Sequence, residues 1–146
     1  MPGIIKDSNN SLFRILGGKE AAANNYNWLV LMVTTMPSGQ RFMCGGNILT
    51  KTKILTAAHC VHNAHSVRIY AGIHQINQAR KFIRVKSTIV HEKYGFPNHD
   101  IAIAILEKPL EYTAKIGPVC LPHHFDSVTE NENLIGLGWG KTKTST

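Results

Sequence analysis

Short runs of apolar and β-branched residues alternate with turn-forming residues along most of the chain. Residues 28–35 form a continuous apolar and β-branched run, long enough for a buried strand. In residues 66–72 and 81–90, apolar residues alternate with basic or polar ones, which is typical of half-buried strands. Turns are indicated between the runs, as at Pro37-Ser38-Gly39. Strands are therefore expected at residues 28–35, 41–49, 53–57, 66–72, 81–90 and 101–106.

Six short strands without a long amphipathic helix favour an all-β fold, a closed antiparallel six-stranded β-barrel. A β-sandwich would produce a similar pattern. In residues 101–106 isoleucines alternate with alanines, so another surface should approach the alanine face closely. Prolines and glycine after residue 108 mark a long connection, and residues 134–139 are expected to begin a new strand. Such a strand would have an unpaired apolar edge that invites association.

Composition is compatible with a packed globular protein, because 43% of the 146 residues are hydrophobic and 17% are charged. Lys and Arg number 16 against 9 Asp and Glu, a formal charge of +7 that would favour anionic partners. The basic residues are dispersed, so a solvated basic surface is the simpler interpretation, and nucleic acid is not expected as a partner. No stretch of 18 apolar residues occurs, so no membrane span is predicted.

Three cysteines, Cys44, Cys60 and Cys120, leave two interpretations open. In an extracellular protein an odd count leaves one thiol that needs a partner elsewhere, whereas a cytosolic chain could keep all three reduced. His59, His62 and His65 recur every third residue, a spacing that could suggest zinc. We expect no metal site there, because zinc needs three or four converging ligands.

Five segments carry recognisable motifs: Arg14-Ile15-Leu16-Gly17-Gly18, Cys44-Gly45-Gly46 with Leu55-Thr56-Ala57-Ala58-His59-Cys60, the strand that begins at Asp100, Pro118-Val119-Cys120-Leu121-Pro122, and Gly138-Trp139-Gly140. In order and spacing they resemble the motifs of trypsin-like serine proteases, whose fold has two β-barrels. The resemblance implies a propeptide or activation segment at residues 1–14 and the first barrel at residues 15–126. It also implies a linker and the first strand of an incomplete second barrel at residues 127–146.

The same resemblance assigns His59 and Asp100 to a catalytic triad. Taken alone, His59 reads as a structural residue beside a cysteine, and Asp100 as a turn residue before a strand of isoleucines. In the family, the histidine is the general base, because imidazole changes charge near neutral pH. The aspartate fixes its tautomer and stabilises the imidazolium.

The nucleophile is not evident. None of the serines at 8, 11, 38, 66, 87, 127 and 145 stands in the Gly-Asp-Ser-Gly-Gly setting that the family uses. We therefore expect the chain to stop before the nucleophilic serine and to be inactive alone. Cleavage between Arg14 and Ile15 would correspond to activation of a zymogen.

By resemblance, Cys44 and Cys60 form the disulfide beside the histidine, and Cys120 pairs with a cysteine outside this sequence. Some relatives bind calcium between the fourth and fifth strands through acidic side chains. Residues 70–90 contain no Asp or Glu, so no calcium site is expected. No cofactor is predicted.

The favoured function is that of a secreted serine endopeptidase acting on protein or peptide substrates, with protease inhibitors as further partners. The start of the chain lacks the apolar core of a signal peptide, so an export signal would lie outside it. An alternative is a non-catalytic homologue that acts as a binding or regulatory protein. A third hypothesis is a polyanion-binding surface made by the basic residues Arg68, Arg80, Lys81, Arg84 and Lys86.

Overall fold

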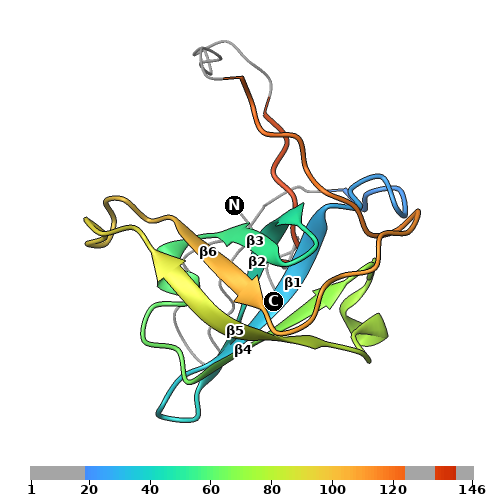
Figure 1. Ribbon diagram of the computed structural model, residues 1–146. Coiled ribbons are helices and arrows are strands. Elements are labelled where there is room, and N and C mark those ends of the chain that lie inside the picture. Colours follow the sequence, from blue (N-terminus) through green and yellow to red (C-terminus); the bar gives the residue numbers. More distant parts are fainter. Residues whose placement is uncertain (1–18, 124–133, 141–146) are drawn as a thin grey trace.

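The computed structural model describes residues 19–123 and 134–140, and the structural statements below concern these residues. Their order along the chain is visible in the colours of Figure 1. Two short 3-10 helices, η1 (Ala58–Cys60) and η2 (Ile76–Gln78), interrupt a succession of strands. The strands are β1 (Leu29–Thr35), β2 (Arg41–Thr50), β3 (Lys53–Thr56), β4 (Ser66–Ala71), β5 (Ile83–Val90) and β6 (Ala102–Leu106). Each of the six strands expected from the sequence is present, with ends shifted by no more than two residues.

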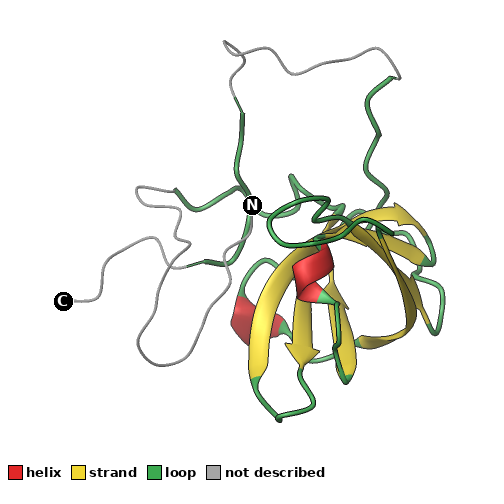
Figure 2. Cartoon of the chain, turned by 90° about the vertical axis from the view of Figure 1, so that its left-hand side faces the viewer, coloured by secondary structure: helices red, strands yellow, loops and turns green. Residues whose placement is uncertain are grey.

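The six strands close into a barrel in the order β1-β2-β3-β6-β5-β4, and every neighbouring pair is antiparallel. Figure 2 shows them curving around a common interior. Closure depends on two non-consecutive pairings, β1 with β4 and β3 with β6. The predicted six-stranded antiparallel barrel is therefore confirmed, and the sandwich alternative is excluded.

Alternation along β2, β3, β4 and β6 separates the interior of the barrel from its outer surface. In β6, Ala102 and Ala104 are buried while Ile103 and Ile105 are only partly buried, so the small side chains face inward. Space is equally limited at Gly46 of β2, where an added Cβ would lie 2.6 Å from the Ile54 side chain. The alanines of β6 thus face the crowded interior of the barrel, as their alternation with isoleucine predicted. The interior is lined mainly by branched side chains, including Val30, Ile48, Ile54, Val67 and Ile69.

The strand expected at residues 134–139 is not formed, because residues 134–140 pair with no strand. Leu134 and Ile135 are 76% and 73% exposed. Trp139 is partly buried, and its indole N–H donates to the backbone carbonyl of His74 at 2.9 Å. An extended segment becomes a strand only when neighbouring backbone satisfies its N–H and C=O groups, and the described residues place none beside it.

None of the helices among the described residues is long and apolar enough to cross a membrane.

Candidate active site

His59 lies in the turn that follows β3, and three contacts fix this turn to the barrel wall. Its neighbour Cys60 is joined to Cys44 of β2 by a disulfide, with the two Cα atoms 6.2 Å apart, which confirms the predicted pairing. The hydroxyl of Thr56 donates to the carbonyl of Gly45 at 2.9 Å. The buried hydroxyl of Thr34 donates to the carbonyl of Cys60 at 2.7 Å. The residues on either side of His59 are thus buried, and the imidazole remains 21% exposed.

Asp100 lies two residues before the start of β6, and the pairing of β3 with β6 brings it to His59. In that ladder Thr56 is opposite Ala102, so the end of β3 and the start of β6 lie side by side. The two functional side chains, 41 residues apart in sequence, therefore meet because of the barrel topology. A local sequence pattern therefore could not predict this contact.

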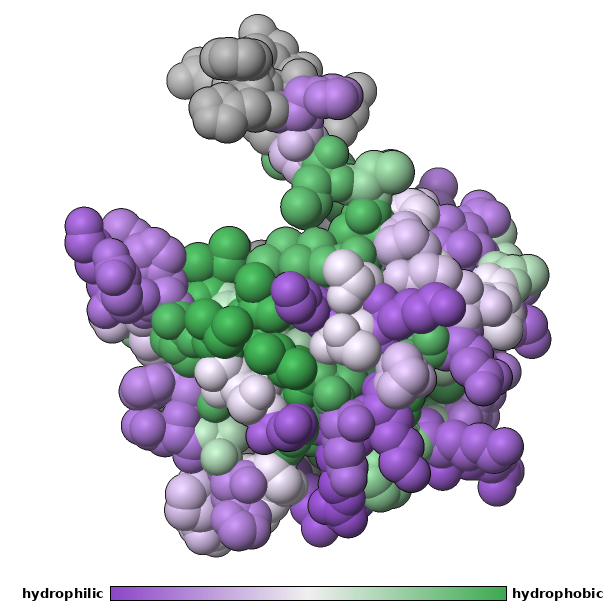
Figure 3. Space-filling model, viewed as in Figure 1, coloured by the Kyte–Doolittle hydropathy of each residue, from purple (hydrophilic) through white to green (hydrophobic). Residues whose placement is uncertain are grey.

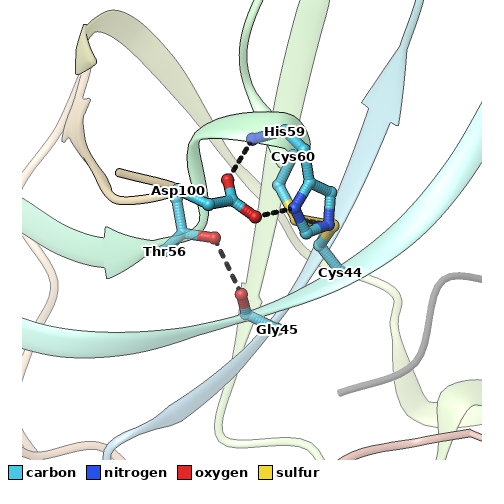
Figure 4. Close-up of polar contacts among 6 residues, drawn as sticks. All are labelled: Cys44, Gly45, Thr56, His59, Cys60 and Asp100. Atoms are coloured by element: carbon cyan, nitrogen blue, oxygen red, sulfur yellow. Dashed lines mark hydrogen bonds and ion pairs between the residues drawn. A yellow bond between two sulfur atoms is a disulfide. The ribbon is translucent and has the colours of Figure 1, made fainter. Parts of the chain in front are cut away.

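Both carboxylate oxygens of Asp100 contact His59. The backbone N–H of His59 donates to Oδ1 at 2.8 Å, and Nδ1 of the imidazole lies 2.5 Å from Oδ2. Figure 4 shows the carboxylate placed between the backbone of the turn and the imidazole ring. Because one carboxylate holds the main chain and the side chain of the same residue, it fixes the position of the ring as well as its hydrogen bonding.

The charge of Asp100 is favoured by these contacts. Burial alone would raise the pKa of Asp100, but the hydrogen bonds from the side chain and backbone of His59 outweigh it, with help from the backbone of Ala58. The pKa of Asp100 is therefore lowered, and the carboxylate is ionised at neutral pH. Burial raises the pKa of the nearby Tyr94, and the negative charge of Asp100 adds to that rise.

An ionised Asp100 determines which nitrogen of a neutral His59 carries the proton. The carboxylate can only accept, so Nδ1 must donate, and Nε2 then keeps a free lone pair. Nε2 lies 3.4 Å from Sγ of Cys60, but this disulfide sulfur has no hydrogen to donate, so the lone pair of Nε2 stays unused. His59 and Asp100 both line a hollow of about 270 Å³ beside β2 and β3. This arrangement can accept a proton from a hydroxyl that enters the hollow.

Phe96 completes one side of the site. Its ring packs edge to face against the imidazole, with centroids 6.1 Å apart, and it is 66% exposed. Sequence analysis missed Phe96 and also the buried Thr34. A polar residue inside the apolar run of β1 was the available signal for Thr34, because a buried hydroxyl needs an acceptor.

Metal binding does not fit this cluster. Within the described residues, the one group of three or more candidate ligand side chains is Cys44, His59 and Cys60, whose ligand atoms lie within 4.8 Å of one another. The two sulfurs are joined to each other, so neither is a thiolate that could bind zinc. The imidazole of His62 is not part of this cluster and packs against the ring of Tyr94, with centroids 5.3 Å apart.

The remaining predicted site residues have different outcomes. Arg14 and Ile15 lie outside the described residues, so the activation site stays a prediction. Cys120 is exposed and has no disulfide in this chain, and its partner likewise stays a prediction. Of the serines, Ser38, Ser66 and Ser87 are described, and none hydrogen-bonds to His59.

Comparison with known proteins gives a consistent result. The family model described as Trypsin matches residues 15–146. The clotting factor G beta subunit of Tachypleus tridentatus is 36% identical over 144 residues, covering 91% of this chain and 46% of its own. Coagulation factor XI of Bos taurus is 34% identical, and the match covers 89% of this chain and 22% of that protein. A venom serine protease of Polistes dominula is 32% identical, and the match covers 89% of this chain and 50% of that protein.

Solved structures share the barrel. One described as HL collagenase aligns with a TM-score of 0.68 and 31% identity, covering 74% of this chain and 47% of that one. A second, described as GrC, gives a TM-score of 0.72 and 26% identity, covering 79% and 52%. The chain thus spans about half the length, or less, of the proteins it matches.

Proposed function

This chain belongs to the trypsin family of serine proteases, and from that premise we propose that it supplies the general base and the orienting carboxylate of a serine endopeptidase. The observation that carries the proposal is the double contact between Asp100 and His59. A carboxylate that merely ended a loop would have no need to hold both the backbone N–H and the imidazole of one residue.

The proposed chemistry follows from the proton positions. Nδ1–H of His59 donates to Asp100, so Nε2 can remove the proton of a serine hydroxyl as that oxygen attacks the peptide carbonyl. The imidazolium formed in this step is stabilised by the adjacent carboxylate. His59 then returns the proton to the amine as the peptide bond breaks. In the second half, His59 removes a proton from water as the water attacks the acyl-enzyme, and returns it to the serine oxygen as the ester bond breaks.

The nucleophile and the oxyanion hole are not assigned to residues of this sequence. None of its serines stands in the family's Gly-Asp-Ser-Gly-Gly setting. The relatives are about twice as long as this chain or longer. We therefore propose that residues outside this sequence supply the nucleophilic serine and the oxyanion hole. Cleavage at Arg14-Ile15 is proposed as the activating step.

Proteins or peptides are the proposed substrates, with protease inhibitors as further partners. The proposed location is extracellular. The Cys44–Cys60 disulfide supports it, because such bonds persist in oxidising compartments. The names of the relatives, two clotting factors and a venom protease, point the same way.

A non-catalytic homologue is the second candidate, and the observation that favours it is the missing serine motif. A fluorophosphonate probe, which labels an activated serine covalently, separates the two. It would be applied to the whole protein after activation, with His59→Ala and, as a matched control, His62→Ala from the same turn. We expect strong labelling of the wild type and of His62→Ala, and loss of at least about 100-fold in labelling rate for His59→Ala. Absence of labelling in the folded wild type would instead establish the non-catalytic homologue.

A further inference from the structure

Two arginines lie directly opposite each other on the outer surface of the barrel. Arg68 of β4 and Arg84 of β5 are register partners in the antiparallel ladder. Their neighbours Val67 and Ile69 are buried, so Arg68 projects from the outer face of β4. Side chains in such a pair start only about 4.5–5.5 Å apart at Cβ, and like charges at this distance destabilise a sheet. A like-charged pair at this position therefore calls for a compensating interaction.

Phe82 supplies part of that compensation. The guanidinium carbon of Arg68 lies 4.7 Å from the centre of the Phe82 ring, and that of Arg84 lies 5.6 Å from it. Tyr70 packs against the same ring, with centroids 6.0 Å apart. Cation–π contacts attract the two guanidinium groups to one ring and restrict their rotamers. The pair is thus held in place before any ligand arrives, which reduces the entropy lost on binding.

Within the described residues, no carboxylate forms an ion pair with Arg68 or Arg84. The sequence contains no Asp or Glu from Val61 to His91. Glu107 approaches through its backbone, whose N–H donates to the carbonyl of Arg84 at 2.9 Å, but its side chain forms no ion pair with either arginine. Within the described residues, both ion pairs that are formed involve histidines elsewhere, at His59 and His74.

The guanidinium of Arg68 also lacks a hydrogen bond at one nitrogen. Its Nε is buried and has no hydrogen-bond partner. A buried donor without an acceptor costs free energy, and the cost is larger when the group is charged. An anion bound to the guanidinium would lower that cost by placing negative charge beside it.

Three more basic residues flank the pair. Arg80, Lys81 and Lys86 are exposed and lie on the segment that leads into and along β5. In Figure 3, hydrophilic residues gather over the lower part of the face where Figure 1 places β4 and β5, whereas hydrophobic residues gather over β6. The exposed basic residues of β4, β5 and the segment before β5 therefore belong to a hydrophilic part of the surface.

We propose that this basic surface, centred on Arg68 and Arg84, binds a linear sulfated polysaccharide. Guanidinium groups bind oxyanions such as sulfate through paired N–H donors, and the flanking residues would contact successive sulfates along the chain. An acidic peptide would meet the same charges, and the competition measurement below distinguishes it from the polysaccharide. Phe82 packs against Arg68, Arg84 and Tyr70 and is still 39% exposed.

The location leaves the candidate active site free. In the closed barrel β4 has β1 and β5 as neighbours, whereas His59 follows β3, which pairs with β2 and β6. β5 also pairs with β6, but Arg84 lies next to Val85, which is opposite Leu106, whereas Asp100 precedes Ala102 at the other end of β6. The binding surface and the His59–Asp100 pair therefore lie on different parts of the barrel wall. Binding of polysaccharide does not depend on the proposed catalytic function.

The test measures the Kd of the whole protein for heparin, used as the defined sulfated polysaccharide, at about 0.15 M salt. Arg68→Gln/Arg84→Gln removes the central pair. Lys53→Gln/Lys93→Gln removes the same charge from exposed positions that lie away from the arginine pair. We expect the arginine variant to bind about tenfold or more weakly, and the lysine variant to change less than about threefold. Equal losses for both variants would overturn the proposal, because net charge alone would then explain binding.

Two further measurements complete the test. Polyglutamate of matched charge should compete at least about tenfold less well than heparin, and equal competition would assign the surface to acidic peptides instead. If the double arginine variant does not fold, the exposed Arg84 is tested alone. Arg84→Lys should then bind more weakly than wild type because it keeps the charge but loses the paired donors, and unchanged binding would contradict the proposal.

Discussion

The disulfide between Cys44 and Cys60 offers the clearest test of how the histidine turn is held. Both residues are buried, at 2% and 4% exposure, and the bond joins β2 to the residue directly after His59. Reducing the bond, or replacing both cysteines by alanine, frees the turn from the barrel wall. Two side-chain hydrogen bonds, from Thr34 and Thr56, would still hold this turn to β1 and β2.

The magnitude follows from the size of the loop. The cysteines are 16 residues apart in sequence. In the chain-entropy model, a cross-link closing a loop of that size lowers the entropy of the unfolded chain enough to stabilise the fold by about 3 kcal/mol. Cys44→Ala/Cys60→Ala also removes two buried sulfur atoms, which adds about 1 kcal/mol at each position. The expected losses are therefore about 3 kcal/mol for reduction and about 5 kcal/mol for the double variant.

Urea unfolding of the oxidised protein, the reduced protein and the double variant separates the two effects. A Cys120→Ser background prevents exchange with the exposed thiol. For an m-value of about 1–3 kcal/mol/M, loss of the cross-link lowers the midpoint by about 1–3 M. A difference below about 1 kcal/mol between oxidised and reduced protein would refute the reasoning, since the turn would then be held without the bond.

Three further predictions follow from individual contacts. Thr34→Val should cost about 1–3 kcal/mol in unfolding free energy, because the carbonyl of Cys60 loses its donor, whereas Thr35→Val on the outer face should be nearly neutral. Ala104→Leu should destabilise the barrel by about 1–3 kcal/mol in the same assay, because its interior leaves no room. The pKa of Asp100 is lowered by folding, so its stabilising effect is present at neutral pH and is lost in acid below about pH 4; the stability difference between wild type and Asp100→Asn should narrow there.

Much of the barrel could be predicted from the sequence, because a continuous apolar run marks β1 and alternation with period two marks β4, β5 and β6. The residues at which the strands begin and end were predicted less accurately. Gly72 leaves β4 because its φ of +67° turns the chain, and β5 begins at Ile83, where pairing with Ile69 begins. Residues 134–139 form no strand among the described residues, because hydrophobicity alone does not provide a pairing partner.

The site was less accessible to such reasoning. The alternation pattern does not say which strands pair, and the contact between His59 and Asp100 depends on the pairing of β3 with β6. Family resemblance, rather than periodicity, selected these two residues and the disulfide. The same limit applies to Arg68 and Arg84, whose charges were evident but whose opposite positions follow from strand register.

Proton position on the imidazole of His59 is the central claim, and nitrogen NMR of the imidazole ring measures it directly. At a pH where His59 is neutral, the account predicts a proton on Nδ1, an unprotonated Nε2, and a strongly downfield Nδ1–H resonance that disappears in Asp100→Asn. A neutral ring protonated on Nε2, or a spectrum unchanged by Asp100→Asn, would contradict the account.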